Sequence, residues 1–247
     1  MPATLFVVHG SHPCATVQRA LERKGVEHRV IEWPPAAHAL LQTLLFQRRT
    51  VPAIRFDDGE RVVGSRAILR RLDERLPSPA LLPADPAARE RVLAAEAWGD
   101  AVLQSIPRRV LWLALDRKPQ AIPTFQEHSR LPMPKAAVPF VAPLIIAAEH
   151  RLNRVNEASV KADLQDLPAH LDRIEGWLAD GTLGGPEANA ADLQIAASLR
   201  LLMTIQDLRG PLEARPAGQL ALRLFPEYDG DVPAGALPEA WLAPLRG

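Results

Sequence analysis

The stretch TLFVVHGSHPCATVQRALERKG, residues 4–25, joins a strand signal to a helix signal through a short turn. The apolar, β-rich run Thr4–His9 predicts a strand. Pro13 then opens a helical pattern that runs to Lys24, and Gly25 follows it. Proline at the start of a helix and glycine just past its end are the usual order of these two residues. The stretch therefore predicts a strand that leads directly into a helix.

Strand and helix signals keep alternating up to residue 76. The turn Asp57-Asp58-Gly59 joins two of the later strands into a hairpin. The elements after the first helix are predicted, in order, as strand His28–Trp33, helix Ala37–Gln47, strand Pro52–Phe56, strand Arg61–Val63 and helix Ser65–Leu76. The order β-α-β-α-β-β-α predicts an α/β N-terminal domain.

A proline-rich stretch separates this domain from the rest of the chain. LPSPALLPADPAAR, residues 76–89, carries four prolines, and proline disfavours helix both at its own position and at the residue before it. We therefore expect one domain at residues 1–78, a linker at 79–88, and a second domain at 89–247 that ends in an extended C-terminal tail.

Only helical patterns follow the linker. The clearest lies at Asp163–Ala179, where apolar residues spaced 3, 4, 3 and 4 apart mark one buried helix face. These residues are Leu164, Leu167, Leu171, Ile174 and Leu178. Further helices are expected at 87–116, kinked or split at Pro107, and at 138–158, 190–208 and 212–224. The second domain is therefore predicted to be an all-α helical bundle.

Composition excludes several classes of protein. The 29 Lys and Arg balance 29 Asp and Glu, whereas a sequence-blind nucleic-acid binder relies on an excess of cations. The longest uncharged apolar-rich window, Ala136–Ala148, is shorter than the roughly 20 residues of a membrane span and contains two prolines. The N-terminus has no basic region followed by a long apolar run. We therefore expect a soluble, cytoplasmic protein without a nucleic-acid or membrane partner.

The segment His9–Cys14 carries the first candidate chemistry. Cys14 is the only cysteine, which rules out an intrachain disulfide and a multi-cysteine zinc site, and the histidines lack metal-ligand spacing, so no metal is expected. The segment lies at the predicted start of the first helix, where unbonded N–H groups and the helix dipole stabilise a thiolate or another anion. A Cys-x-x-Cys pair here would be redox-active, but its first position is Ser11.

Three short motifs fall in order at predicted element boundaries. They are S-H-P-C at Ser11–Cys14, T-V-P at Thr50–Pro52 and G-S-R-A-I at Gly64–Ile68. Together with the proline-rich linker and the helical second part, they resemble the glutathione transferase superfamily, with a serine-type, theta-like or glutaredoxin-like N-terminal domain. The resemblance implies a thioredoxin-like N-terminal domain, glutathione as co-substrate, and a homodimer.

The same resemblance assigns roles around glutathione. Ser11 would donate its hydroxyl to the glutathione thiolate, and Val51 would pair its backbone with the tripeptide beside a cis Pro52. Ser65 and the N–H of Arg66 would hold the γ-glutamyl carboxylate at a helix start. The remaining glutathione-binding residues expected from the motifs are His12, Cys14, Thr50 and Gly64. Gly64 stands where many family members have an acidic or amide residue.

The electrophile pocket of this superfamily lies between the domains. By analogy its candidate residues are Arg108, Arg109, Trp112 and Phe125, together with the tail Pro226–Gly247 and its Trp241. These side chains would suit a flat or anionic substrate.

Three functions remain open on the sequence. The first is conjugation of glutathione to a small electrophile, as in detoxification; the second is glutathione-dependent thiol-disulfide exchange through Cys14; the third is a non-catalytic, transferase-like module that binds ligands or partners. The one tyrosine, Tyr228, lies far from the first strand, which excludes a tyrosine-type transferase. Ser11 could instead cap its helix, and Asn189-x-x-Asp192 resembles an N-capping box.

Overall fold

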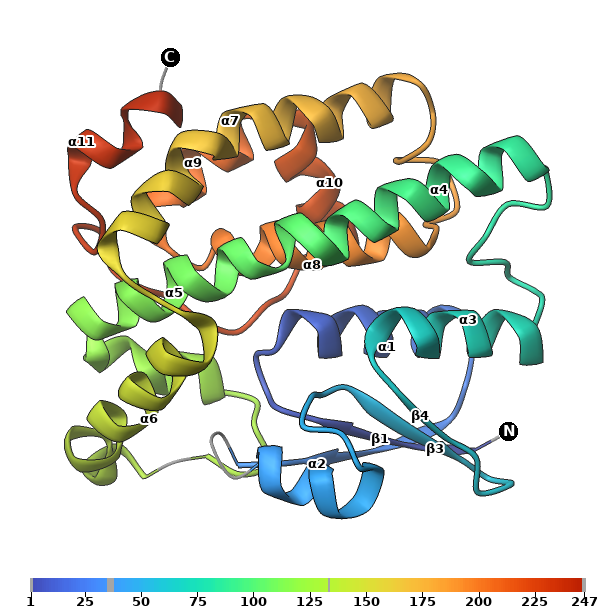
Figure 1. Cartoon of the computed structure of the whole chain (residues 1–247), viewed down its shortest axis with the longest axis horizontal. Helices are drawn as coiled ribbons and strands as arrows, with labels where there is room; N and C mark the ends of the chain where they lie inside the picture. Colours follow the sequence, from blue (N-terminus) through green and yellow to red (C-terminus); the bar gives the residue numbers. More distant parts are fainter. Residues whose placement is uncertain (1, 35–37, 133, 246–247) are drawn as a thin grey trace.

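A computed structural model describes residues 2–34, 38–132 and 134–245 and contains a small mixed sheet beneath a layer of helices (Figure 1). Within these residues the strands are β1 (Ala3–Val7), β2 (His28–Glu32), β3 (Ala53–Phe56) and β4 (Arg61–Val63), in the order β2-β1-β3-β4. β1 runs parallel to β2 and antiparallel to β3, which pairs antiparallel with β4. The predicted α/β thioredoxin-like arrangement is confirmed.

Helices cover both faces of the sheet. α1 (His12–Arg23) and α3 (Ser65–Arg75) lie on the face toward the C-terminal helices, and α2 (His38–Phe46) lies on the opposite face (Figure 1). α1 begins with Pro13 in its first turn and buries Val17, Ala20 and Leu21 completely. The first residue of the predicted second helix, Ala37, lies outside the described residues.

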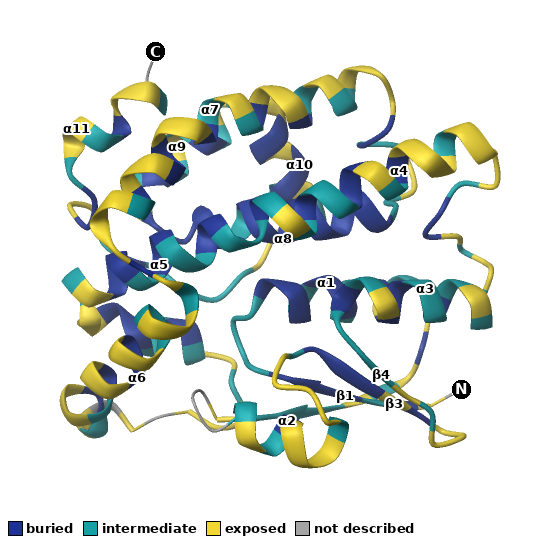
Figure 2. Ribbon diagram, in the orientation of Figure 1, coloured by how far each residue is buried: buried dark blue, intermediate teal, exposed yellow. Residues whose placement is uncertain are grey.

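Helices form the rest of the chain, as predicted. They are α4 (Pro86–Trp98), α5 (Ser105–Arg117), α6 (Val138–Asn153), α7 (Glu157–Ala179), α8 (Ala190–Leu202), α9 (Gln206–Glu213), α10 (Pro216–Leu224) and α11 (Glu239–Leu242), with 3-10 turns at Pro119–Gln126, Lys135–Ala137 and Ala243–Leu245. α8 packs against α1, α4, α5 and α10, and of its residues only Arg200 is not buried. Buried positions gather where α1, α5 and α8 face one another, while the outer turns of α6 and α7 are exposed (Figure 2).

The predicted break near Pro107 lies one turn earlier. A π-helical turn, Gly99–Leu103, separates α4 from α5, and the N–H of Gln104 donates to the carbonyl of Gly99 at 2.8 Å. Proline lacks an N–H and its ring presses on the carbonyl four residues before it, here that of Leu103. The irregularity therefore falls before the proline. A side chain at Gly99 would crowd Ile195 of α8, with Cβ 3.1 Å from its Cγ1.

Three predicted helix boundaries are wrong. The helix expected at 138–158 ends at Asn153, because Arg154 adopts a left-handed φ of 55° and Asn156 then caps α7 in a box with Ser159. The helices expected at 190–208 and 212–224 are three, since α8 ends at Leu202 and α9 spans Gln206–Glu213. α10 starts at Pro216, a residue that suits a first helical turn.

Two capping and packing predictions are confirmed. Asn189 accepts from the N–H of Asp192 at 3.0 Å, and the Asp192 carboxylate accepts from the N–H of Asn189 at 2.9 Å, which makes the predicted capping box. The predicted apolar stripe of α7 is buried at Leu164, Leu167, Leu171 and Ile174, whereas Leu178 is only partly buried. Both features depend on local spacing alone.

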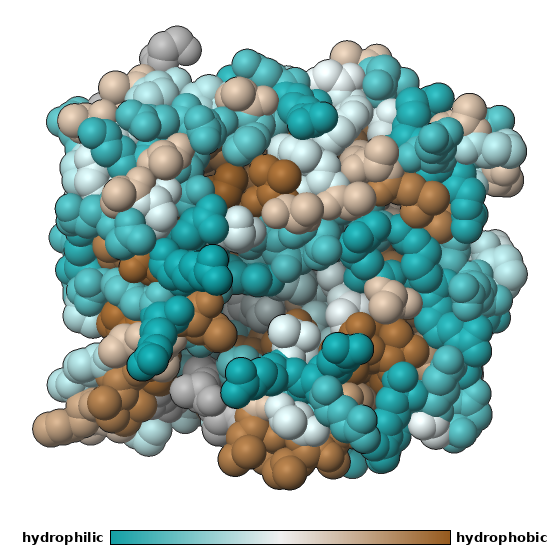
Figure 3. All heavy atoms as spheres, viewed as in Figure 1, coloured by the Kyte–Doolittle hydropathy of each residue, from teal (hydrophilic) through white to brown (hydrophobic). Residues whose placement is uncertain are grey.

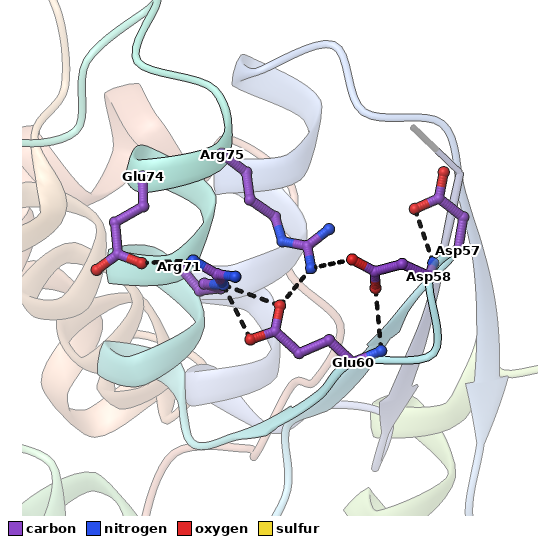
Figure 4. Close-up of polar contacts among 6 residues, drawn as sticks. All are labelled: Asp57, Asp58, Glu60, Arg71, Glu74 and Arg75. Carbon is purple, nitrogen blue, oxygen red and sulfur yellow. Dashed lines mark hydrogen bonds and ion pairs between the residues drawn. The ribbon is translucent and has the colours of Figure 1, made fainter.

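Charged side chains tie the outer edge of the sheet to α3 (Figure 4). Arg71 donates from Nε to both carboxylate oxygens of Glu60, at 2.9 and 2.8 Å, and Arg75 contacts Glu60 and Asp58. Asp58 is exposed and the other three residues are only partly buried, so each pair stabilises the fold modestly. They fix the β3–β4 turn against α3.

No helix among the described residues is long and apolar enough to cross a lipid bilayer.

Candidate functional site

A cavity of about 640 Å³ lies between the sheet-containing domain and the helical domain. The β1–α1 loop, the segment before β3 and the start of α3 line one side, and the π turn, α5, the Pro119–Gln126 turn and α6 line the other. Its lining includes nine of the expected residues: Ser11, His12, Thr50, Val51, Gly64, Ser65, Arg108, Trp112 and Phe125. Cys14, Pro52, Arg66 and Arg109, which were also expected in the site, do not line it.

Ser11 immediately precedes α1 and occupies its N-cap position. Its backbone is extended, at φ −76° and ψ 117°, and its carbonyl accepts the N–H groups of Cys14 and Ala15 at 2.9 and 3.0 Å. Its side chain makes no capping hydrogen bond, so the capping interpretation is wrong. The hydroxyl is left to interact with the Cys14 sulfur and with whatever occupies the cavity.

The thiol of Cys14 lies behind this loop, 2% exposed. Burial raises its pKa to about 11, although hydrogen bonds from Ser11 and the Val8 backbone and the charge of Arg108 oppose the shift. The group is therefore a neutral thiol at pH 7, and reactive cysteines need the thiolate and access to solvent. Cys14 is packed as a small apolar residue.

His12 is a buried residue of the cavity lining. Burial, and next the charge of Arg108, lower its pKa well below the ordinary value, and a backbone hydrogen bond with Gln104 opposes them only in part. The ring is therefore neutral. Its Nε2 has no hydrogen-bond partner among the described residues.

The segment before β3 places Val51 on the cavity. The Val51–Pro52 peptide bond is cis, as the resemblance implied, and the carbonyl of Pro52 accepts the N–H of Gly64 at 2.9 Å. This bond brings the start of α3 beside Val51. The peptide of Val51 makes no hydrogen bond to another described residue, so both of its polar groups can pair with an extended ligand.

α3 begins at the cavity with an N-cap that has no side chain. Gly64 has φ +95°, in the left-handed region that favours glycine, and it makes no side-chain cap. The first-turn N–H groups of α3 are therefore open to an anion. The Ser65 hydroxyl donates across the domain interface to Oε1 of Gln194 at 3.2 Å, and the Arg66 side chain reaches Glu96 of α4 at 3.3 Å. Arg66 can thus contribute its N–H but turns its guanidinium away.

Two adjacent arginines of α5 point in different directions. Arg108 lines the cavity and donates to Oε1 of Gln104, whereas Arg109 makes a two-point ion pair with Asp163 of α7, with Nε 2.6 Å from Oδ2. Successive residues of an α-helix are about 100° apart, and this turn directs Arg109 toward α7 while Arg108 faces the cavity. The expectation that Arg109 belongs to the pocket is wrong.

Apolar side chains complete the helical wall. Trp112 and Phe125 line it as expected, and the sequence did not single out their neighbours Leu111, Leu115, Ile122, Ile145, Ala148 and Leu152. Glu149 and Asn153 are polar members of this wall, and burial raises the pKa of Glu149. Exposed apolar residues extend outward from the mouth on α2 and α6, where Figure 3 shows them gathered on either side of a hollow; they include Leu44 and Phe140, 72% and 78% exposed.

The expected tail, Pro226–Gly247, contacts residues that line the cavity, but through Tyr228 and Gly230 rather than Trp241. Trp241 does not line the cavity and packs against Arg117, whose guanidinium lies 5.2 Å from its ring. Instead Tyr228 donates its hydroxyl to the carbonyl of Gly10 at 3.1 Å, and Gly230 packs against Phe125. The tail therefore contacts the loop that carries Ser11 and the Phe125 part of the cavity wall.

His9 and Asp229 form the contact that the sequence did not suggest. The His9 Nε2 lies 2.6 Å from Oδ2 of Asp229 and its Nδ1 lies 3.5 Å from Glu32, while His128 Nδ1 lies 2.7 Å from Oδ1 of Asp229. Burial favours a raised pKa for Asp229, but the hydrogen bonds from His9 and His128 hold it below its usual range. Because 220 positions separate His9 from Asp229, no local pattern could have revealed the pair.

The site contains no obvious metal centre. No group of three or more His, Cys, Asp or Glu side chains among the described residues could hold a metal ion. The groups able to bind a ligand are a hydroxyl, two helix N-termini, the peptide of Val51 and the guanidinium of Arg108.

Comparisons with known proteins find relatives of the N-terminal part of the chain and of its fold. Residues 5–80 match the family model described as glutathione S-transferase, N-terminal domain. Maleylacetoacetate isomerase from Pseudomonas aeruginosa is 46% identical over 77 residues, which span 30% of this chain and 32%, about a third, of that relative.

Solved structures resemble the chain over most of its length. A glutathione S-transferase from Rhodospirillum rubrum has a TM-score of 0.60 at 19% identity, covering 99% of this chain and 100% of that one. One from Methylobacterium radiotolerans, in complex with glutathione sulfonate, has a TM-score of 0.54 at 20% identity, covering 91% and 90%. At these identities the likeness establishes the fold.

Proposed function

We propose that the protein, whose residues 5–80 match the family model of the glutathione S-transferase N-terminal domain and whose fold resembles that of solved glutathione S-transferases, is a glutathione-dependent enzyme. The Ser11 hydroxyl would stabilise the glutathione thiolate for attack on a small electrophile. The observation that carries the proposal is the position of this hydroxyl at the start of α1, uncommitted to capping and on the cavity surface.

Three parts of the N-terminal domain suit the tripeptide. The thiolate would sit at Ser11, where the first-turn N–H groups and dipole of α1 also favour a negative charge. The peptide of Val51 would pair with the glutathione backbone, and the N–H groups of Ser65 and Arg66 would receive the γ-glutamyl carboxylate. His12, Thr50 and Gly64 would contact the same ligand from the cavity lining.

Lowering the pKa of the glutathione thiol contributes less to the rate than positioning and polarising the electrophile. A thiol of pKa about 8.5 is about 3% ionised at pH 7, and lowering its pKa by about two units makes about 75% thiolate. The weaker nucleophilicity of the less basic thiolate offsets about eightfold of that gain. The net gain is about threefold, so positioning and polarisation of the electrophile by the helical wall must supply most of the rate. In the step itself a carbon–sulfur bond forms and the leaving group departs with its electron pair.

Thiol-disulfide exchange through Cys14 fits the site less well. The thiol does not line the cavity, and burial raises its pKa to about 11. A non-catalytic binding module remains the alternative if no electrophile is turned over.

A second candidate reaction is glutathione-dependent isomerisation of an unsaturated acid. Its support is the 46% identity over 77 residues to an enzyme named for the isomerisation of a maleyl compound. In such a reaction the thiolate adds to a double bond, the bond rotates, and the thiolate leaves again. Glutathione is then not consumed, which distinguishes this reaction from conjugation.

The same premise supports a homodimer that acts on electrophiles in the cytoplasm, in a detoxifying role. Sedimentation equilibrium of the purified protein tests the dimer, and fractionation of the source cells tests the compartment.

Substitution of Ser11 tests the proposal. We expect Ser11→Ala to lower kcat toward a panel of chloronitrobenzenes and unsaturated acids at pH 7 by about threefold, the net gain from thiolate stabilisation, to raise the pKa of bound glutathione by about two units, and to change the Kd for glutathione little. Cys14→Ala is the matched control and should retain activity. The proposal fails if the protein does not bind glutathione in calorimetry, or if Ser11→Ala turns over every substrate as well as wild type.

A further inference from the structure

Arg108 has no carboxylate partner among the described residues, unlike several arginines of α3 and α5. Arg109 pairs with Asp163, Arg117 with Glu157, and Arg66 and Arg70 with Glu96. Among the described residues no ion pair involves Arg108, and its side-chain partner is the neutral amide of Gln104. Arg108 is partly buried on the cavity wall, and a partly desolvated guanidinium without a counter-ion would be stabilised by an anionic ligand.

The charges near Arg108 do not supply that counter-ion. Asp100 and Glu149 act on it only from beyond ion-pair distance, and burial raises the pKa of Glu149, whose Oε2 accepts from Asn153 at 2.8 Å. His12 and Cys14, which lie close on the other side, are neutral. The helical wall of the cavity therefore presents one uncompensated positive group.

The surrounding residues hold the guanidinium in place. Gln104 accepts from Arg108 and donates from Nε2 to Oδ1 of Asp100 at 3.2 Å, so its amide has a defined orientation. All three residues line the cavity and lie on or just after the π turn. Arginine has five N–H donors in a planar fork, and Gln104 uses only one edge of it. The remaining donors match the two oxygens of a carboxylate.

The rest of the wall defines the body of the ligand. Beyond the polar residues Asp100, Gln104, Glu149 and Asn153, the helical side is mainly apolar and includes the flat rings of Trp112 and Phe125. The other lining arginine, Arg49, is solvent-exposed and lies beside Thr50 and Val51, on the side proposed for glutathione. The two cations thus serve opposite sides of the cavity.

We propose that Arg108 is a carboxylate-binding residue that selects, as the second substrate, a small aromatic or unsaturated carboxylic acid. Its carboxylate binds the guanidinium and its apolar body lies along Trp112 and Phe125, which points the reactive carbon toward Ser11. Calling this acid a substrate rests on the proposed function. Its binding to Arg108 does not require turnover.

Binding of a non-reacting acid tests the site without catalysis. We expect calorimetry to detect cinnamate but not cinnamamide, the uncharged analogue, in glutathione-free protein. Arg108→Met should weaken cinnamate binding at least tenfold, the usual weight of a hydrogen-bonded charge pair, and Arg108→Lys should restore part of it. Arg109→Met, which removes the same charge one position along, should leave cinnamate binding unchanged.

Turnover of a matched pair of electrophiles tests selection. 4-Chloro-3-nitrobenzoate and its amide share ring and leaving group, and each enzymatic kcat/KM is divided by the rate with glutathione alone. Wild type should prefer the acid by tenfold or more, and Arg108→Met should reduce that ratio to near one.

Two outcomes overturn the inference. One is equal binding of cinnamate and cinnamamide to wild type. The other is an Arg108→Met protein that loses affinity for glutathione and keeps it for cinnamate, which would assign Arg108 to the tripeptide. Cinnamate binding that depends on Arg108 in a protein without any transferase or isomerase activity would support the site and refute the proposed function.

Discussion

Two cations lie near the two ends of α1: Lys24 at its C-terminal end, and Arg108 of α5 beside its N-terminal end. Lys24 has a carboxylate partner and Arg108 has none among the residues that the structure describes. The Lys24 side chain is fully buried where α1 ends, and its Nζ donates to Oδ1 of Asp73 at 2.9 Å and to the carbonyls of Leu76 and Pro79 at 2.6 and 2.8 Å. All three of its donors are used. Arg108, beside the start of α1, meets only a neutral amide and a cavity.

The difference separates a structural end of the domain interface from a binding end. At the Lys24 end, one charge joins α1, α3 and the segment leading to α4, and its desolvation is compensated by matched acceptors. At the Arg108 end, the Ser11 loop is held by the distant tail through Tyr228 and Asp229. Substitutions at the two ends should therefore act on different properties.

The largest effect is expected for Lys24→Met. It leaves the Asp73 carboxylate and two carbonyls without their buried donor, so the free energy of unfolding should fall by about 3–5 kcal/mol. Urea denaturation measures the loss. Lys161→Met, at an exposed position of α7, should change stability by less than about 0.5 kcal/mol. Similar losses of unfolding free energy in Lys24→Met and Lys161→Met would show that the buried Lys24 contacts do not stabilise the domain interface.

At the cavity end the largest effect is expected for Gly230→Ala. Gly230 has φ +117°, and a Cβ there would lie 2.2 Å from Cε1 of Phe125. Backbone strain and overpacking together should cost about 2–3 kcal/mol and displace Phe125 from the cavity wall.

Gly235→Ala is the matched control for this change. Gly235 also has a positive φ, +78°, but its Cβ would meet nothing closer than 3.9 Å. Urea denaturation should assign it the smaller cost of backbone strain, about 1 kcal/mol. Equal costs for the two alanines would mean that the Phe125 contact does not hold the tail.

A smaller, pH-dependent effect is expected for Asp229→Asn. Asp229 has a lowered pKa in the folded protein, so its contribution is complete above the unfolded value of about 3.9 and is lost as pH falls through the folded value. Its hydrogen bond raises the pKa of His128, whose contribution is complete below about 6.5 and is lost as pH rises through the folded value. The stability difference between wild type and variant, about 1 kcal/mol from the His9 contact, should be largest between these limits.

Urea denaturation from pH 3.5 to pH 9 measures this difference. The other titratable groups that act on the cluster are Glu32, beside His9, and Glu127 and Glu227, near His128. Asp231→Asn is the control, because Asp231 bonds Arg209 and Gln206 rather than histidine and should show only the loss at low pH. A stability difference that does not change with pH would show that Asp229 does not fasten the tail to the β1–α1 loop through its histidine contacts.

The sequence predicted what short-range rules determine. The strand and helix order, the capping box of Asn189 and the cavity positions of Ser11, Val51 and Ser65 follow from motifs at element boundaries. Side chains on a long helix are different, because their direction depends on helix phase. The π turn before α5 shifts that phase, and although Pro107 predicted a break in this helix, neither its position nor its π geometry could be foreseen, so Arg108 and Arg109 could not be told apart.

Contacts between distant segments were beyond the sequence for a different reason. His9 meets Asp229 only because the tail crosses behind the Ser11 loop, and nothing near either residue encodes that crossing. Trp241 was expected in the pocket by analogy with transferases whose C-terminal tail contributes to it, yet it packs on Arg117. Tertiary packing decides which tail residue reaches a site.

The smallest effect on stability is expected for Arg108→Met. Its neighbour sets the scale, since Arg109→Met leaves the nearly buried Asp163 without its two-point partner and should cost about 2–3 kcal/mol. Arg108→Met removes a desolvated charge with no carboxylate partner among the described residues, so stability should change by less than about 0.5 kcal/mol or increase.

Adding cinnamate should reverse the order of wild type and Arg108→Met. A ligand that binds only the folded state stabilises it by about 1.4 kcal/mol at a concentration tenfold above Kd. Wild type should gain this amount and the Arg108→Met protein should not, as measured by the shift in its urea midpoint. If Arg108→Met lowers the free energy of unfolding by about 2–3 kcal/mol without ligand, this arginine stabilises the fold, as Lys24 does, and is not a free anion-binding group.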